Sequence, residues 1–268
     1  GGRSFFGGAG CKLMGLVCSI GWVTVSITGV SSGRDPGLFG PDSVAWQIHS
    51  EPAALVGGLR ALMIQALHPL AMAGVADHSD YRVKPWDRLA RTSEYLVRSI
   101  YGTRLEAQAA AAAVRQVHRR VHGIDGHTGL SYSADDPELL AFVHHSSVQS
   151  FLASHCRYVQ PLSQRDRDRY VGEMAVLAEL LGTPPALLAR DEAELNHLLG
   201  PGRPALLQVT PAAREALRFI VSPPMPAYLR PGWLLVASAA MDLLPDWARD
   251  LYGLGWQASI HALARPAV

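Results

Sequence analysis

The sequence predicts an all-α protein of roughly nine or ten helices, each on the order of a dozen residues long. Three observations support this prediction. Apolar residues recur with helical spacing over almost all of the chain beyond residue 40. Prolines, glycines and capping residues divide these stretches into helix-sized pieces. After residue 35 there is no Asn-Gly turn and no sustained alternation of apolar and polar residues, so strand signals are few.

The predicted helix boundaries coincide with prolines, glycines and residues that cap helices. The predicted starts are 41–43, 51–52, Pro85, Leu105, 135–137, Arg165, Pro184, Pro211 and Trp233. The predicted breaks and ends are Pro69, Gly102, Gly123, Leu181, Leu199, Val221, Pro245 and Leu251. The Ala-rich helix of this set covers 105–122, and the three glycines of 123–133 predict a loop after it.

The chain has 268 residues, of which 49% are hydrophobic, so it can build one large domain with a substantial core. We predict that this domain covers 36–268 and that 1–35 form a separate apolar segment and linker. Within the latter, 13–30 is an uncharged run that follows Arg3 and Lys12. Such a run either directs the chain to a membrane or packs as a buried segment.

Charge and cysteine content limit the function classes. The net charge is +1, and no basic stripe stands apart from acidic residues, which argues against a nucleic-acid partner. The three cysteines, Cys11, Cys18 and Cys156, form no CxxC pair and predict free thiols in a reducing compartment. We therefore expect a cytoplasmic protein, with membrane association through 13–30 as the alternative.

His118 is the most informative single residue, because it interrupts an apolar helical stripe. That stripe consists of Ala110, Ala111, Val114, Val117, His118 and Val121. A buried imidazole needs a partner for its nitrogens, which is either a hydrogen-bonding group or a metal. His122 follows one helical turn later, a spacing found in pairs of metal ligands. The alternative for His122 is a cap before Gly123.

Other candidate residues lie on neighbouring predicted helices. Arg88, Arg91, Thr92 and Tyr95 share one helix face by their spacing, and arginines on such a face can clamp a carboxylate. The alternative is a solvated face paired with Glu94 or Asp87. His68 precedes Pro69 and is either a site residue or a cap at the helix C-terminus, and His144 follows an apolar pair.

These clusters, taken in order, resemble a known family. The matching motifs are LFGP at 38–41, Trp46, EP at 51–52, QALHP at 65–69, Arg88 with Thr92, YG at 101–102, His118 with Val121 and Gly123, YSADDP at 132–137, and FVH at 142–144. Together they resemble the catalytic domain shared by bacterial rubber oxygenase (latex-clearing protein) and the fungal mpaB-type oxygenases. The resemblance spans about 38–251.

The resemblance implies a globin-like helical core that holds haem b, with His118 as the proximal iron ligand. Arg88 and Thr92 match an Arg and a Thr that rubber oxygenases carry over the haem, whereas Arg91 stands where they carry Lys. His122 stands where they carry Arg. A protonated Arg neither ligates iron nor acts as a base readily. Because the chain lacks a CxxCH motif, the haem is expected to be noncovalent.

The implied reaction is dioxygen activation and oxidation of an apolar small molecule, such as a terpenoid or a lipid. We assign catalytic roles to Arg88, Arg91 and Thr92, and cofactor binding to His118, Arg88, His68 and His144. The distal position stays open between His68, His144, Arg91 and water. Two alternatives remain: a non-haem metalloenzyme that uses His118, His122 and a third ligand such as His144 or an acidic residue, and a haem-binding protein without catalysis.

Overall fold

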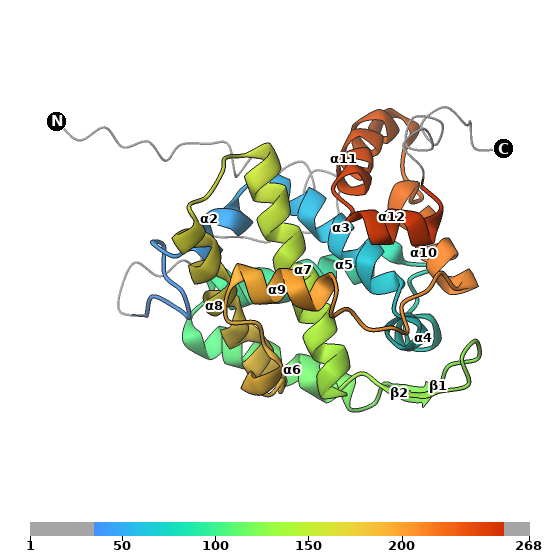
Figure 1. The fold of residues 1–268 in the computed structure, drawn as a ribbon, viewed down its shortest axis with the longest axis horizontal. Helices are drawn as coiled ribbons and strands as arrows, with labels where there is room; N and C mark the ends of the chain where they lie inside the picture. The colour runs from blue at the N-terminus through green and yellow to red at the C-terminus, as the bar shows by residue number, and fades with distance from the viewer. Residues whose placement is uncertain (1–34, 255–268) are drawn as a thin grey trace.

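Helices make up most of the structure, a computed structural model that describes residues 35–254 (Figure 1). The described part contains eleven α-helices, two short 3₁₀ turns and one two-stranded hairpin. The helices are α2 (Val44–Ser50), α3 (Ala53–Ala66), α4 (Pro69–His78), α5 (Pro85–Tyr101), α6 (Arg104–His118), α7 (Pro137–Tyr158), α8 (Gln164–Leu181), α9 (Glu192–Leu199), α10 (Pro211–Val221), α11 (Arg230–Asp242) and α12 (Asp246–Tyr252). The predicted all-α class is confirmed, whereas the apolar run 13–30 lies outside the described residues.

The centre of the molecule is the crossing of α3 and α7, which share the most extensive contact between any two helices (Figure 1). Both are apolar on several faces, as expected for helices surrounded by others. The backbones approach closely at Gly57, where an added Cβ would lie 2.9 Å from the Cα of Phe151. Arg60 crosses the same interface, and its guanidinium donates to Ser150 Oγ at 2.7 Å and to the Leu243 carbonyl at 2.8 Å.

Capping residues place the helix starts where the sequence predicts them. Ser43 accepts a hydrogen bond from Trp46 N at the start of α2, and Asp136 accepts from the backbone of Glu138 and Leu139 at the start of α7. Thr103 and Glu106 form a reciprocal capping box at the start of α6. Each of these bonds satisfies a backbone N–H that the helix itself leaves without a partner.

Pro69 separates α3 from α4, as predicted, and the two helix axes meet at 102°. Among the described residues, no single helix has the length and apolar character needed to cross a membrane. The α3–α4 pair passes that test only when its two sharply bent halves are counted together.

Two predictions about the middle of the chain are wrong. The Ala-rich helix ends at His118 rather than at His122, because the backbone turns at Arg119 and Arg120. The predicted loop 123–133 instead contains an antiparallel hairpin of β1 (His122–Ile124) and β2 (Ser131–Ser133). Its turn is closed by Asp125, whose carboxylate accepts hydrogen bonds from the backbone of His127 and Thr128. A three-residue strand is too short to show alternation in the sequence.

The C-terminal half follows the predicted pattern with small changes. The broken helix predicted over 184–199 is a 3₁₀ turn, η1 (Pro185–Leu187), followed by α9. Pro245 divides α11 from α12, as predicted, and α11 begins three residues earlier than Trp233, after η2 (Ala227–Leu229). α11 packs onto α3 and α10, whereas α9 packs onto α7 and α8.

Candidate functional site

His118 lies in the last turn of α6 and is half-buried. Its Nδ1 atom is shielded from solvent and has no hydrogen-bond partner among residues 35–254. The buried face of α6 is formed by Ala107 and Ala111, whereas Val117 is 59% exposed, so the predicted stripe is wrong at that position. A buried ring nitrogen without a partner is costly, so we expect a water, an ion or a bound group to satisfy it.

Two charged side chains act on the His118 ring. Burial lowers the pKa of His118, the carboxylate of Asp135 opposes that shift, and the guanidinium of Arg88 adds to it. The ring is therefore neutral at pH 7, and neutral imidazole is the form that ligates metal ions.

The β1–β2 hairpin holds this end of α6 in place. Val121 N donates to the His118 carbonyl at 2.9 Å, and Ala134 N donates to the Val121 carbonyl at 2.8 Å. Gly123 is required here, because an added Cβ would lie 2.8 Å from the hydroxyl of Tyr132. That hydroxyl donates to the Asp77 carboxylate on α4 at 2.7 Å. The surroundings of His118 are thus fixed by α4, α6 and the hairpin together.

The α5 face predicted to carry catalytic residues divides into two parts. Arg88 is half-buried and forms no ion pair with any residue that the structure describes. Burial lowers its pKa, and the nearby guanidinium of Arg91 lowers it further. Arg91 and Thr92 are exposed, and Thr92 Oγ1 donates to the Arg88 carbonyl at 3.1 Å. Of these three residues, only Arg88 lies within electrostatic range of His118.

The alternative interpretation of this face, a solvated surface whose arginines pair with Glu94 or Asp87, does not describe Arg88, which is half-buried and pairs with neither. Glu94 pairs with Arg98 at 2.8 Å rather than with Arg88. A half-buried guanidinium without a carboxylate partner is an open anion-binding group, since its five N–H donors have no charged acceptor.

His68 is buried and caps a helix, but not the helix end that the sequence suggested. It is the N-cap of α4, where its Nδ1 accepts a 3.5 Å hydrogen bond from Ala71 N, and it is not a C-terminal cap of α3. Its ring lies 5.1 Å from that of Phe142 on α7. Burial lowers the pKa of His68, so this ring too is neutral.

His144 and His145 follow one another on α7 and differ in their contacts. Burial lowers the pKa of His144 to about 3, and the neighbouring His145 ring contributes to the shift. His145 Nε2 accepts a hydrogen bond from Ala189 N at 3.1 Å, which gives His145 a structural role. No hydrogen bond of the His144 ring is found within the described part of the chain, so it remains a candidate for ligand contact.

The metal pair of His118 and His122 is not formed. His122 lies in β1, beyond the end of α6, and is exposed, so the one-turn spacing no longer places the two rings on one face. Within residues 35–254 no group of three or more His, Cys, Asp or Glu side chains is arranged to hold a metal ion. A non-haem site built on these two histidines is therefore not supported.

Sequence reasoning missed two residues around His118. From the sequence, Asp135 is part of a predicted helix start and Tyr132 is part of the YSADDP motif, and neither is predicted to act near His118. The charge of Asp135 acts on the His118 ring, and Tyr132 contacts Asp77 and the backbone at Gly123, near the end of α6. The position of both depends on the β1–β2 hairpin, for which the sequence carries no periodic signal.

Buried histidines predict a loss of stability in acid. The pKa of His49 is lowered to about 3 and that of His145 to about 4, both by burial, from the ordinary value of 6.5. As the pH falls below 6.5 the unfolded chain binds protons that the folded chain does not, so stability present above pH 6.5 is lost toward pH 4. Urea unfolding across this range measures the slope.

The matched variant is His145→Gln, whose side-chain carbonyl still accepts from Ala189 N but does not titrate. It should show a shallower pH dependence than the unsubstituted protein. An unchanged slope would contradict the role assigned to His145.

Comparison with protein-family models matches residues 46–268 to the family described as ER-bound oxygenase mpaB/B'/Rubber oxygenase, catalytic domain. No curated protein and no solved structure gives a significant match. The globin-like arrangement expected from the resemblance therefore stays a prediction. The match includes α5, α6 and α7, which carry Arg88, His118 and His144. The chain belongs to the mpaB/rubber oxygenase catalytic-domain family, and hence to a family of oxygenases.

Proposed function

We propose that this protein is a haem b-dependent oxygenase that uses dioxygen to oxidise an apolar small molecule, of terpenoid or lipid character. The observation that carries the proposal is His118, a neutral, half-buried imidazole with an unpartnered Nδ1. Beside it lies Arg88, a half-buried guanidinium without an ion pair. A neutral imidazole could ligate haem iron, and a nearby cation could bind a propionate.

The side chains of His118 and Arg88 fit the needs of a bound haem b. His118 would ligate the iron, and Arg88 would bind a propionate through charge-assisted hydrogen bonds. When bound, haem b would supply the redox chemistry by which dioxygen is activated. Arg91 is exposed, and a protonated guanidinium does not readily act as a base, so its role would be limited to the solvent side of a propionate.

The protein's own contribution is to hold these groups rigidly. The hairpin fixes the end of α6 through Ala134 N, and the short link between α5 and α6 fixes Arg88 relative to His118. Burial keeps the His118 ring neutral, so no proton has to leave before it binds. The Thr92 hydroxyl donates to the Arg88 carbonyl of the same helix, so its hydrogen already has an acceptor when no ligand is bound.

The experiment that tests the proposal is a titration of the purified protein with haem b, followed by absorption spectra of the oxidised and reduced forms and a pyridine haemochrome assay. A stoichiometric Soret band is expected. A protein that stays colourless would overturn the proposal. Incubation of the reduced, haem-loaded protein with dioxygen and a panel of terpenoids and lipids then tests oxidation. Haem binding without any product would support a carrier or sensor instead.

Arg88 and Arg91 provide a matched pair of variants. Arg88→Leu should weaken haem binding by roughly 10- to 150-fold, since a charged hydrogen bond contributes about 1.5–3 kcal/mol. Arg91→Leu, at an exposed position on the same helix, should change affinity little. Haem titration of both variants measures the difference, and equal affinities would contradict the role of Arg88.

A further inference from the structure

α4 connects two parts of the candidate site. His68 is its N-cap, and Asp77 lies in its last turn. The helix has 10 residues and is therefore about 15 Å long. It packs against the β1–β2 hairpin, which begins four residues after His118 (Figure 1). Any contact that holds the hairpin on α4 therefore also fixes where His118 lies relative to His68.

One hydrogen bond between side chains joins the hairpin to α4. Tyr132 Oη on β2 donates to Asp77 Oδ2 at 2.7 Å. Tyr132 is 5% exposed, whereas Asp77 is exposed, so the carboxylate keeps its contact with water. Burial and the bond to Asp77 raise the pKa of Tyr132 to about 12, so the phenol stays protonated and remains a donor at neutral pH. We call Tyr132 and Asp77 the hairpin clasp.

Two glycines leave room for the ring of the clasp. An added Cβ at Gly74 on α4 would lie 3.3 Å from Val121 Cγ1 and 3.8 Å from the Tyr132 ring. An added Cβ at Gly123 on β1 would lie 2.8 Å from the Tyr132 hydroxyl. The ring is therefore in close contact with both α4 and β1, and these contacts aim its hydroxyl at Asp77.

Backbone hydrogen bonds connect the clasp to His118. Ala134, two residues after Tyr132, donates its N–H to the Val121 carbonyl at 2.8 Å, and Val121 N donates to the His118 carbonyl at 2.9 Å. The Nδ1 atom of His118 has no partner of its own within the described part of the chain. The position of the His118 ring therefore depends on this backbone rather than on a hydrogen bond made by Nδ1.

We propose that Tyr132 and Asp77 are positioning residues that hold the His118 ring at a fixed place relative to His68. The inference rests on the proposed function, because it assigns these residues a role toward the same haem site. They act through α4 and the backbone next to His118. Residues that support a metal ligand typically change metal affinity by 10- to 100-fold when they are substituted, so the clasp should control how tightly haem is held.

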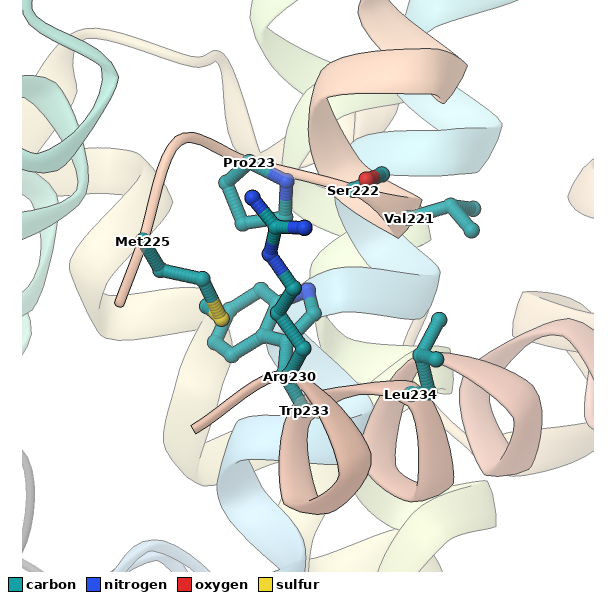
Figure 2. A pocket seen from close by; sticks show the side chains of 7 residues that line it. All are labelled: Val221, Ser222, Pro223, Met225, Arg230, Trp233 and Leu234. Atoms are coloured by element: carbon teal, nitrogen blue, oxygen red, sulfur yellow. The ribbon is translucent and has the colours of Figure 1, made fainter. Parts of the chain in front are cut away.

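A small pocket elsewhere on the molecule provides a place for a control. It opens between the end of α10 and the start of α11 and is lined by side chains from 221–225 and 230–234 (Figure 2). Its volume is about 40 Å³, whereas pockets for drug-sized ligands measure roughly 300–1,000 Å³, so it is too small to enclose such a molecule. The pocket contains no residue of the clasp and no candidate ligand.

Tyr132→Phe tests the inference, because it removes the donor and keeps the ring packed on Gly74 and Gly123. In the haem-free protein, the amides of Val121 and Ala134 should exchange with deuterium about tenfold faster or more, since a hydrogen bond to a charged acceptor is worth at least that factor. Haem affinity should fall by about 10- to 100-fold. Exchange followed by NMR and haem titration followed by absorption measure the two effects.

Two substitutions of Asp77 identify the hydrogen bond as the cause. Asp77→Ala removes the acceptor and should match Tyr132→Phe in both measurements. Asp77→Asn keeps a carbonyl oxygen that can accept from the phenol, so it should preserve most of the haem affinity. Equal losses in the two Asp77 variants would contradict the role of this bond.

Two further variants control for a general loss of stability. Tyr252→Phe on α12 removes a buried 2.7 Å hydrogen bond to the Met63 carbonyl, and Trp233→Phe, in the small pocket, removes a 3.0 Å bond to the Ile220 carbonyl. Neither tyrosine nor tryptophan contacts the hairpin through these bonds. Both variants should leave the exchange of the Val121 and Ala134 amides and the haem affinity unchanged.

The outcomes separate this inference from the proposed function. If Tyr132→Phe leaves either the amide exchange or the haem affinity unchanged, the inference is wrong. It is also wrong if Tyr252→Phe or Trp233→Phe weakens haem binding as much as Tyr132→Phe does. If the unsubstituted chain binds no haem, the proposed function fails, whereas faster exchange in Tyr132→Phe alone would still support the clasp as the contact that holds the end of α6.

Discussion

His118→Ala is expected to lose bound haem and its Soret band. In metal sites, removal of a residue that only supports a ligand lowers affinity by roughly 10- to 100-fold, so removal of the ligand itself should lower it further. The variant should still fold, since His118 is half-buried and its ring forms no hydrogen bond that the fold requires. Haem titration followed by absorption, together with circular dichroism of the haem-free protein, separates these effects.

Two controls make this result specific to the His118 ring. His122→Ala removes an exposed imidazole four residues away and should leave the spectrum unchanged. His118→Gly leaves a space that free imidazole can fill, so added imidazole should restore the Soret band. If His118→Ala keeps the spectrum of the unsubstituted protein, the assignment of His118 as the iron ligand is wrong, and His68 and His144 are the next positions to substitute.

The helices were predictable because their boundaries depend on local chemistry. Ser43, Asp136 and Pro245 act on backbone groups within a few residues of themselves, so a single sequence shows their effect. The sequence predicts that this helix ends at His122, four residues beyond its real end at His118, because Gly123 is a typical residue after a helix C-terminus. Gly123 instead serves close packing against Tyr132, a contact that depends on the hairpin.

The candidate site was predictable only in part. The sequence identified His118 and Arg88 through spacing and resemblance, and the structure brings both within electrostatic range of one another. The sequence left open whether Arg91 and Thr92 are exposed, and it did not indicate that His122 leaves the helix. Those properties depend on which helix face meets α6 and on where the chain pairs with β2, and local patterns do not encode such long-range contacts.

Gly57→Ala is expected to destabilise the protein by about 1–3 kcal/mol, because it overpacks the central crossing of α3 and α7. The added Cβ would lie 2.9 Å from the Cα of Phe151 and 3.0 Å from the Ser150 carbonyl oxygen. Both are backbone atoms, so rotation of a side chain cannot relieve the clash and one helix has to move. Urea or thermal unfolding of the variant measures the loss, which corresponds to a melting temperature lower by about 2–4 °C per kcal/mol.

The adjacent glycine gives a control of opposite sign. An added Cβ at Gly58 would lie 3.9 Å from Phe151 Cε1, an ordinary contact distance. Gly58→Ala should therefore stabilise α3 by about 0.5–1 kcal/mol through helix propensity alone. Equal effects of the two substitutions would show that the close approach at Gly57 does not limit packing.

The different effects expected for Gly57→Ala and Gly58→Ala matter for the candidate site as well. α7 carries His144 and α3 leads into His68, so movement of either helix would displace these candidate ligands.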